Sequence, residues 1–477
     1  MLSNENNTNT DNTNTDLQQL VKSQRTFFSS KATYPLEFRI AQLKKLKHAL
    51  QSAMPDIVKA LYEDLGRCEM EAEFDLAVIK TIDYFIANLP TWLAKKSFPA
   101  SPMQAPAEVY IEPIPLGACL IISPWNYPIE LTIAPLLGAI SAGNTAIIKP
   151  SEYSPNCSQV LSNIINNTFD SDYLHVVTGD AAVAEQLLTN KFAHIFYTGS
   201  TAVGRKVYEA ASHHLTPVIL ELGGKSPCVV DKNIDYKQAA KRILFGKLIN
   251  SGQTCVAPDY CLVDAEAYDS LVQALQEVLL EFHPQGALKS KDYSKIISLK
   301  HLQRLQKLLA LQNINDVICG GEVDVDNMRI APCIINLPNL DDCNSNPVMQ
   351  EEIFGPILPI ICYKNLEDIL KVVALNPQPL ALYVFTNDDN FAEQVLDNIQ
   401  SGGSCINDIM VHLFNDNCGF GGIGTSGLGA YHGELSFKAY SHFRTVAKRK
   451  LHSNYPLDVR FPPYHNIIAK LFRKFFM

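Results

Sequence analysis

The sequence lacks a long apolar segment, a strong excess of one charge and any closely spaced pair of cysteines. Asp and Glu number 49 against 40 Lys and Arg, so the formal net charge is only −9 in 477 residues. This mild acidity offers no general electrostatic footprint for nucleic acid. The 12 cysteines are scattered, without a C-x-x-C pair or a histidine spacing typical of zinc sites. We therefore expect reduced thiols in a cytoplasmic protein, and no metal site.

The N-terminal segment lacks the features of a secretion signal. Residues 1–16 are almost all Asn, Thr and acid, with neither a basic start nor an apolar run, so we expect a disordered lead-in there. The longest uncharged stretch, Leu131–Ile148, contains Pro135 and Gly143 and fits a helix, a turn and a strand better than a membrane span. Hydrophobic residues make up 47% of the chain, which is enough for a large core.

The segment 446–477 is a C-terminal tail whose last part predicts an amphipathic helix. Apolar side chains from Ile467 to Phe476 fall on one helical face, and Lys470, Arg473 and Lys474 fall on the other. This pattern is typical of a helix that lies in the surface of a membrane, although the segment is too short to span a bilayer. The same apolar face also suits docking on the chain itself or on a partner subunit, so both alternatives stay open.

The order of predicted elements indicates the fold class. Apolar residues recur at helical steps from Leu17 to about Leu93, and Ser101–Pro115 alternates around Val109 and Ile111 as an extended excursion or hairpin does. Short apolar strands then alternate with helices, which implies parallel sheets covered by helices. The expected strands are Cys119–Ile122, Thr145–Ile148, Leu174–Val177, Ile195–Tyr197, Val218–Leu220, Cys228–Val230, Tyr260–Val263, Ile357–Cys362 and Leu380–Phe385. We predict an α/β fold with two Rossmann-like parallel-sheet domains and a small β-hairpin element.

Glycine-containing loops are candidates for binding a dinucleotide. The G-x-G-x-x-G string Gly422–Gly427 follows no clear strand, so we interpret it as a glycine-rich turn. At Gly199–Gly204 a strand runs into glycine and then into a helix, whose first N–H groups suit a pyrophosphate, although such turns are common. Lys149 and Glu152 follow another strand end, where α/β sheets bind ligands, and a solvated strand end with a helix-capping acid is an equal alternative there.

Three side chains could together support acyl chemistry through a thioester. Cys255 follows a small polar turn, Glu221 ends a strand before two glycines, and Asn126 follows a third strand. A thiolate, a carboxylate base and an amide donor are the groups that such chemistry needs. Most buried cysteines are only packing groups, and spacing does not show that these three residues meet in space. The interpretation therefore depends on a likeness to a known family.

Six strings occur along the chain in the order known from one enzyme family. They are Pro124-Trp-Asn-Tyr-Pro, Lys149-Pro-Ser-Glu, Thr198-Gly-Ser-Thr, Glu221-Leu-Gly-Gly-Lys, Gly252-Gln-Thr-Cys and Glu351-Glu-Ile-Phe-Gly-Pro. From about Leu17 to Pro463 the chain resembles the NAD(P)-dependent aldehyde dehydrogenase superfamily. It is most similar to the class 3 branch, which includes fatty-aldehyde and coniferyl-aldehyde enzymes, through Thr254–Tyr260 and Gly427–Gly433.

The resemblance implies roles for individual residues. Cys255 would attack the aldehyde, Asn126 and the backbone N–H of Cys255 would form the oxyanion hole, and Glu221 would activate water. The residues that it assigns to cofactor binding are Lys149, Glu152, Gly199, Ser200, Gly204, Glu352 and Phe354. The carboxylate of Glu152 favours NAD over a cofactor with a 2′-phosphate, but class 3 relatives often accept both, so NADP stays an alternative.

The resemblance also implies an organisation and a substrate class. It divides the chain into a cofactor-binding domain (17–98 and 118–222), a catalytic domain (223–404) and a bridging or oligomerisation element (99–117 and 405–445). It implies a homodimer that oxidises medium- or long-chain aliphatic or aromatic aldehydes to carboxylic acids, and it favours a membrane contact of the tail by analogy. Asn417–Phe420 departs from the Leu-Pro that usually precedes Phe-Gly-Gly, so substrate preference is expected to differ there.

Three other functions remain as alternatives. An acylating enzyme would use coenzyme A to resolve the thioester, but Glu221 favours water as the acceptor. A catalytically silent member used for binding or structure would be marked by loss of Cys255 or Asn126, and both are present. A cysteine hydrolase would leave the dinucleotide strings without a purpose. Aldehyde oxidation is therefore the leading prediction.

Overall fold

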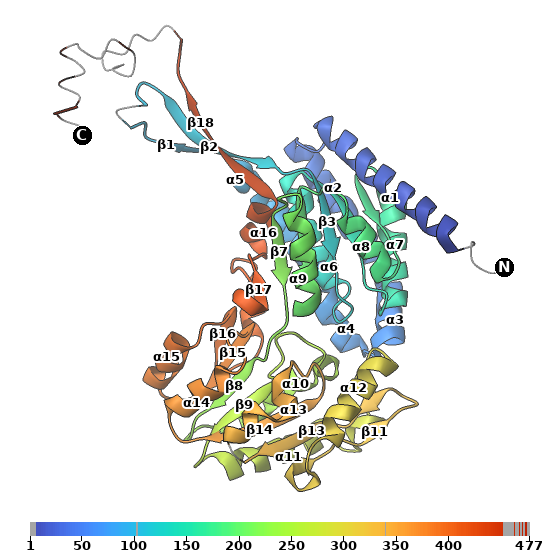
Figure 1. Ribbon diagram of the computed structural model, residues 1–477, viewed down its shortest axis with the longest axis vertical. Helices are drawn as coiled ribbons and strands as arrows, with labels where there is room; N and C mark the ends of the chain where they lie inside the picture. Colours follow the sequence, from blue (N-terminus) through green and yellow to red (C-terminus); the bar gives the residue numbers. More distant parts are fainter. Residues whose placement is uncertain are drawn as a thin grey trace.

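The computed structural model describes residues 6–101, 104–338 and 340–451, and five single positions beyond them. Four sheets form within these residues. Two are large, helix-covered and mostly parallel, a narrow third sheet projects from the body (Figure 1), and the fourth is the short pair β11 (Val323–Asp324) and β12 (Arg329–Ile330). The predicted α/β class with parallel sheets is confirmed. Most of the predicted C-terminal amphipathic helix lies outside the described residues. Within the described ranges, no helix is both long and apolar enough to cross a bilayer.

The first sheet contains six strands in the order β17-β7-β6-β3-β4-β5. Its strands are β3 (Ala118–Ile122), β4 (Thr145–Lys149), β5 (Leu174–Val176), β6 (His194–Thr198), β7 (Val218–Glu221) and the antiparallel edge strand β17 (Gly427–Leu428). The helices between its strands are α6 (Glu130–Ala142), α7 (Pro155–Thr168), α8 (Ala181–Leu188) and α9 (Thr201–Ser212). All residues of β3, β4 and β6 are buried, as expected of strands covered on both faces.

The N-terminal helices pack beside this sheet. They are α1 (Asn6–Ser29), α2 (Leu36–Ser52), α3 (Met54–Leu65), α4 (Glu69–Leu76) and α5 (Val78–Leu93). Helix α1 begins inside the segment 1–16, for which the sequence predicts disorder because Asn and Thr are poor helix formers. Leu17 and Val21 of the same helix are buried in a core cluster with Leu120 and Ile147 of the sheet, so tertiary packing supports the helix.

The second sheet contains seven strands in the order β10-β13-β14-β9-β8-β15-β16. They are β8 (Pro227–Val230), β9 (Tyr260–Asp264), β10 (Val317–Cys319), β13 (Cys333–Leu337), β14 (Ile357–Tyr363), β15 (Ala381–Phe385) and β16 (Gly403–Ile406). Its main helices are α10 (Tyr236–Leu248), α11 (Tyr268–Phe282), α12 (Leu299–Ala310), α14 (Leu366–Val373) and α15 (Asp389–Asn398). The strands predicted from the sequence for both sheets are confirmed.

The projecting sheet joins distant parts of the chain. The hairpin strands β1 (Lys96–Phe98) and β2 (Glu108–Pro115) pair antiparallel, and β18 (Ser441–Lys448) runs along the full length of β2 (Figure 1). The hairpin expected around Val109 and Ile111 is confirmed. Its pairing with β18 was not predicted, because the sequence contains no local signal for a partner more than 300 residues away.

The register of the first sheet positions polar residues at one edge. Ile122 pairs with Lys149 and Thr198 pairs with Glu221, so β3, β4, β6 and β7 end at the same level. The chain then crosses from Glu221 to Pro227, where β8 of the second sheet begins. Because ligands of α/β proteins bind outside the carboxyl ends of parallel strands, this edge is where a functional site is expected.

Candidate active site

The turn before Cys255 has an unusual backbone conformation. Asn250, Ser251 and Gly252 have φ angles of 52°, 53° and 74°, all in the left-handed region. Only glycine adopts this region without cost, so two strained residues in sequence need external support. Ser251 Oγ donates to the carbonyl of Ser294 at 2.6 Å, which ties the turn to the following segment.

Gln253 supplies further support for this turn. Its side-chain Nε2 donates to the carbonyls of Asn250 and Lys295, each at 2.9 Å. Its Oε1 accepts from the N–H of Ile297 at 2.9 Å. Gln253 is 1% exposed, so these hydrogen bonds form away from water and fix the approach to Cys255.

Asn126 lies directly beside the same turn. Its side-chain Nδ2 donates to the backbone carbonyl of Gln253 at 3.0 Å. The backbone carbonyl of Asn126 accepts from Nδ2 of Asn250 at 2.9 Å and from the guanidinium of Arg67. Arg67 is buried, forms an ion pair with Asp75 at 3.2 Å and lies 4.1 Å from the centre of the Tyr127 ring. An amide NH₂ has two donors, so Asn126 keeps a second N–H for an oxyanion.

Cys255 shares its environment with two carboxyl groups. Burial raises the pKa of its thiol, and the charges of Glu352 and Glu221 raise it further. Glu221 is 3% exposed, and neither of its carboxyl oxygens has a hydrogen-bond partner among the described residues. Burial alone therefore holds the pKa of Glu221 well above its usual range. The structure brings together the predicted nucleophile, the predicted base and Glu352, with Asn126 beside them.

Glu352 occupies the space above a glycine pair. A Cβ atom at Gly223 would collide with its carboxyl group, so a larger residue there would displace the Glu352 side chain from this position. The backbone N–H of Gly224 donates to the same carboxyl. Burial and then the charge of Asp259 raise the pKa of Glu352 to about 8.

A buried ion pair holds the segment that carries Glu352. Lys225 pairs with Asp259, and its Nζ also donates to the carbonyls of Val348 and Glu351, at 2.7 and 3.0 Å. Asp259 Oδ1 accepts from the N–H of Ile353 at 3.0 Å. Because the two charges are 2% and 3% exposed, these hydrogen bonds compensate most of their desolvation. The network connects the glycine pair after β7, the Cys255 segment and the Glu352 segment.

Residues at the ends of three strands show whether a nicotinamide dinucleotide fits this edge of the sheet. Ser123 directly follows β3, and Thr198 is the last residue of β6. Both hydroxyl groups are buried and have no hydrogen-bond partner in the part of the chain that the structure describes. Lys149 Nζ donates to the carbonyl of Pro150 at 2.8 Å and lies 3.4 Å from Glu152 Oε2. Unsatisfied hydroxyls beside a cation and a carboxylate suit the hydroxyl and phosphate groups of a dinucleotide, so the residues fit the cofactor.

The loop into α9 lies beside the predicted base. Gly199 N–H donates to the carbonyl of Glu221 at 3.0 Å, and Ser200 caps the helix by accepting from the N–H of Val203. A Cβ atom at Gly204 would lie 2.5 Å from Leu222 Cδ2, so glycine allows α9 to approach the strand end closely. The G-x-G-x-x-G string instead forms a short 3₁₀ turn followed by β17, as the sequence interpretation expected.

Phe354 belongs to an aromatic group between the two large sheets. Its ring lies edge-on to Trp125, with ring centres 5.3 Å apart. His301 of α12 lies 5.1 Å from Trp125 and 5.5 Å from Tyr153 by the same measure. His301 was not predicted, because a single histidine on an amphipathic helix carries no sequence signal.

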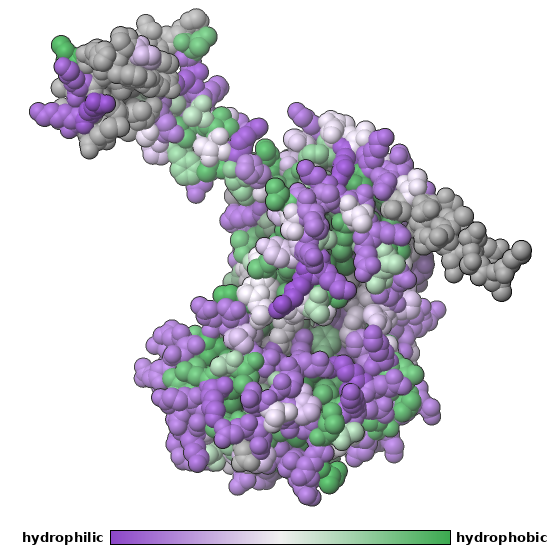
Figure 2. All heavy atoms as spheres, viewed as in Figure 1, coloured by the Kyte–Doolittle hydropathy of each residue, from purple (hydrophilic) through white to green (hydrophobic). Residues whose placement is uncertain are grey.

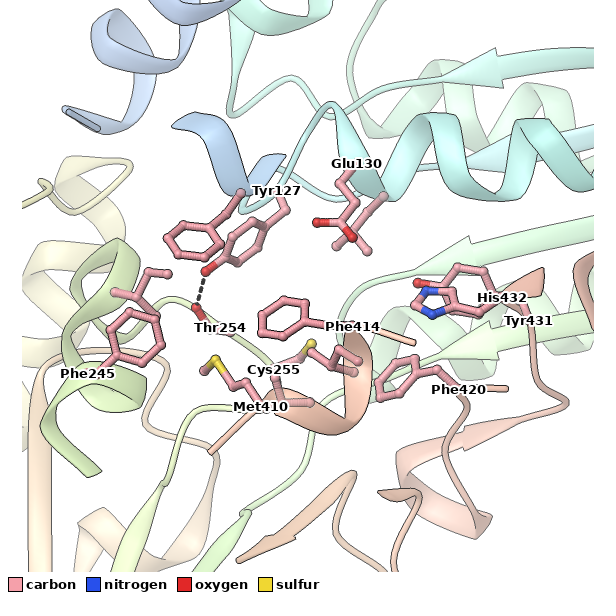
Figure 3. Close-up of a pocket in the computed structure, with 15 residues that line it drawn as sticks. Tyr127, Glu130, Phe245, Thr254, Cys255, Met410, Phe414, Phe420, Tyr431 and His432 are labelled. Carbon is pink, nitrogen blue, oxygen red and sulfur yellow. Dashed lines mark hydrogen bonds between the residues drawn. The ribbon is translucent and has the colours of Figure 1, made fainter. Parts of the chain in front are cut away.

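A pocket opens next to Cys255, and Figure 3 shows the side chains that surround it. It encloses about 700 Å³, including its open mouth. Its wall is mostly apolar and aromatic, and Tyr127 hydrogen-bonds Thr254 at 2.8 Å on one side. The lining residues include Phe74, Phe245, Met410, Phe414, Phe420 and Tyr431. The segment Asn417–Phe420, for which the sequence analysis expects an effect on substrate preference, therefore borders the pocket through Phe420.

Comparisons with known proteins agree with this site. The family model described as the aldehyde dehydrogenase family matches residues 4–446. The chain belongs to the aldehyde dehydrogenase family. It is 42% identical to the dimeric NADP-preferring aldehyde dehydrogenase of Canis lupus familiaris over 94% of this chain and 98% of that protein. It is also 42% identical to the 4,4'-diaponeurosporen-aldehyde dehydrogenase of Staphylococcus aureus, over 94% and 96% of the two chains.

A solved structure shows the same likeness. The substrate-bound Staphylococcus aureus AldH superimposes with a TM-score of 0.92 at 40% identity, covering 96% of this chain and 99% of that chain. The predictions of the family, of an oxidoreductase that acts on aldehydes and of a nicotinamide dinucleotide cofactor are confirmed. The choice between NAD and NADP stays a prediction, as do the roles of individual residues.

The supporting residues around the site were missed by sequence reasoning. Arg67, Asn250 and Asp259 act through buried contacts, and an isolated charged or amide residue gives no pattern that predicts such contacts. The buried role of Lys225 could have been predicted from the sequence. This lysine directly follows Gly223 and Gly224, between two apolar strand segments, and a charged residue in such a place needs a partner when it is buried.

Removing the cation of the buried pair should destabilise the protein. Lys225→Met leaves Asp259 buried, and among the described residues the opposite charge that remains paired with it is Lys247, at 4.0 Å. We expect the free energy of unfolding to fall by about 3 kcal/mol, measured by denaturant titration. The double variant Lys225→Met/Asp259→Leu should regain part of this loss, because it leaves no uncompensated charge. Equal stability of wild type and Lys225→Met would contradict the assigned role.

Proposed function

We propose that this chain oxidises aldehydes to carboxylic acids with NAD⁺ or NADP⁺, through a thioester on Cys255. The observation that supports this most directly is that Cys255 lines an apolar pocket and lies close enough to the buried carboxyl of Glu221 for that charge to raise the pKa of its thiol. Cys255 acts as nucleophile, Glu221 as general base and Asn126 as oxyanion donor.

The first step forms a bond between the Cys255 sulfur and the aldehyde carbon. The thiolate attacks, and the carbonyl π electrons move to oxygen to give a tetrahedral thiohemiacetal anion. The free N–H of Asn126 and the backbone N–H of Cys255 donate to this oxyanion. The rigid turn at Asn250–Gln253 holds both donors in place, so little reorganisation is needed when charge develops.

The second step breaks the C–H bond of the thiohemiacetal and leaves a thioester. A bound NAD⁺ or NADP⁺ would supply the acceptor for the departing hydride. Glu352 and Phe354 would hold its nicotinamide end, and Lys149 and Glu152 would bind its adenosine ribose. Gly199, Ser200 and Gly204 would form the loop beside its pyrophosphate.

The third step hydrolyses the thioester. The carboxylate of Glu221 removes a proton from water, the water oxygen bonds to the acyl carbon, and the C–S bond then breaks to restore the Cys255 thiolate. Glu221 has no competing hydrogen-bond partner among the described side chains and backbone groups, which leaves both of its oxygens for water. This supports water over coenzyme A as the acceptor.

The pocket supports a substrate class. Phenylalanine, tyrosine, leucine and methionine side chains line most of its wall, and apolar walls of this kind favour medium- or long-chain aliphatic or aromatic aldehydes over acetaldehyde. One relative is named 4,4'-diaponeurosporen-aldehyde dehydrogenase, and this name is consistent with a substrate larger than acetaldehyde.

We also propose a homodimer formed through the projecting sheet β1-β2-β18. Phe98 and Phe443 of this sheet are about 40% exposed, and Figure 2 shows apolar residues beside the body where the sheet leaves it. A relative is named as dimeric. The cytoplasmic location stays a prediction. The peripheral membrane contact of the tail also stays a prediction, because most of the tail lies outside the described residues.

The nucleophile can be tested directly. Cys255→Ala should lower the rate of NADH or NADPH formation by more than about a thousandfold with every aldehyde of a panel from short aliphatic to cinnamyl-type substrates. The absorbance of the reduced nicotinamide gives the rate. Cys362→Ala, which removes a half-buried thiol of β14, should keep the wild-type rate. Turnover that survives in Cys255→Ala would contradict the proposal.

The rate should rise with pH. A carboxyl group whose pKa is raised stays protonated over a wider acidic range, and a protonated Glu221 cannot accept a proton from water. The raised pKa of the Cys255 thiol acts in the same direction, because the thiolate fraction grows with pH. We expect kcat to increase steadily between about pH 6 and 9 in saturating substrate and cofactor. A rate that falls over this range, while the protein stays folded by circular dichroism, would contradict the assignment.

A further inference from the structure

A polar pair interrupts the apolar wall of the pocket. Glu130 begins α6, and His432 directly precedes α16 (Gly433–Ala439). Both residues line the pocket that contains Cys255. In Figure 3 the Glu130 carboxyl points into the space between the labelled side chains, and the His432 ring lies at the edge of this space beside Tyr431. The proposed chemistry at Cys255 uses neither residue.

The cavity continues beyond this pair. A second pocket of about 760 Å³, including its open part, shares Glu130, His432, Leu413 and Phe414 with the first. Its further lining is more polar than that of the first pocket, with Lys80, Thr81 and Asp416. Glu130 and His432 therefore lie where an apolar chamber next to Cys255 meets a second chamber whose lining contains more polar groups.

The backbone fixes both side chains and leaves their polar atoms open. The N–H of Glu130 donates to Asp75 at 2.7 Å, and the N–H of His432 donates to Ser436 Oγ at 2.8 Å. Among the residues that the structure describes, no hydrogen bond reaches the Glu130 carboxyl oxygens or the His432 ring nitrogens. Polar atoms at a pocket wall without a protein partner are available to a ligand or to water.

The charge state of the pair selects the kind of ligand. Burial, and next the charge of Asp75, raises the pKa of Glu130 to about 8; Arg67 opposes this and Asp416 adds to it. Burial lowers the pKa of His432 to about 4. Both shifts favour the uncharged forms, which are a carboxylic acid that donates and a neutral imidazole that both donates and accepts. Such a pair matches an uncharged oxygen group better than a carboxylate or an ammonium group.

We propose that the pocket takes aldehydes that carry a hydroxyl group remote from the aldehyde, which hydrogen-bonds Glu130 and His432 at the boundary of the two chambers. This proposal rests on the proposed function, because it names the substrate class of the same site. The apolar chamber holds the chain between the two oxygen groups. The buried hydrogen bonds then distinguish a hydroxyalkanal from a plain alkanal of the same length.

The test compares pairs of substrates within each enzyme variant. We would measure kcat/KM for a series of ω-hydroxyalkanals of eight carbons or more and for the matching alkanals, with wild type, Glu130→Gln and Glu130→Leu. At one chain length the wild type should prefer the hydroxyalkanal, and Glu130→Leu should lower this preference about tenfold. Glu130→Gln, which keeps a donor, should retain most of it. Comparing the ratio within a variant removes effects of the substitution on folding.

Matched controls separate this proposal from the function on which it rests. Glu434→Gln changes an exposed acid of α16 that pairs with Lys438, and its substrate ratio should equal that of the wild type. Equal ratios in wild type and Glu130→Leu at every chain length would overturn the proposal while leaving aldehyde oxidation intact. A preference for an ω-trimethylammonio aldehyde that disappears in Glu130→Gln would also overturn it, in favour of a cation site. If the wild type oxidises no alkanal, the proposed function itself fails.

Discussion

The burial of Glu221 without a polar partner is the constraint around which the site is organised. Its carbonyl accepts the N–H of Gly199 and its strand pairs with β6 and β17, so its backbone is held on both sides. Its carboxyl group, in contrast, has no hydrogen-bond partner among the described residues. Burying a carboxyl group in this state costs folding free energy and raises its proton affinity, which fits the proposed role of Glu221 as a base.

The surrounding structure supplies the rigidity that this arrangement requires. The left-handed turn before Cys255 is held by Ser251, Gln253 and Asn126, and the Glu352 segment is held by the Lys225–Asp259 pair. These supports come from segments that follow strands of both large sheets, and they hold Cys255, Asn126 and Glu221 in a fixed relation. Strain in the turn persists because several hydrogen bonds determine it at once.

The fold could be predicted from the sequence in large part, because buried parallel strands are short apolar runs between helical segments. The expected strands, including the hairpin strand at residues 108–115, follow from local composition alone. The pairing of β18 with β2 and the buried role of Arg67 could not be predicted, since each depends on a contact between distant residues. The strings around Cys255, Glu221 and Asn126 indicated the candidate site. Glu130 and His301 lie in no such string, and His432 lies in Gly427–Gly433 without a role assigned to it, so their place in the structure alone draws attention to them.

The most direct test of this account is to trap the thioester. Intact-protein mass spectrometry of Glu221→Gln, mixed with NAD⁺ and a medium-chain aldehyde, should show the added mass of one acyl group. That mass should be lost in the double variant Glu221→Gln/Cys255→Ala. The wild type should release carboxylate and accumulate little acyl enzyme. Free carboxylate formed by Glu221→Gln at the wild-type rate, with no acyl adduct, would contradict the role of Glu221 as the base that hydrolyses the thioester.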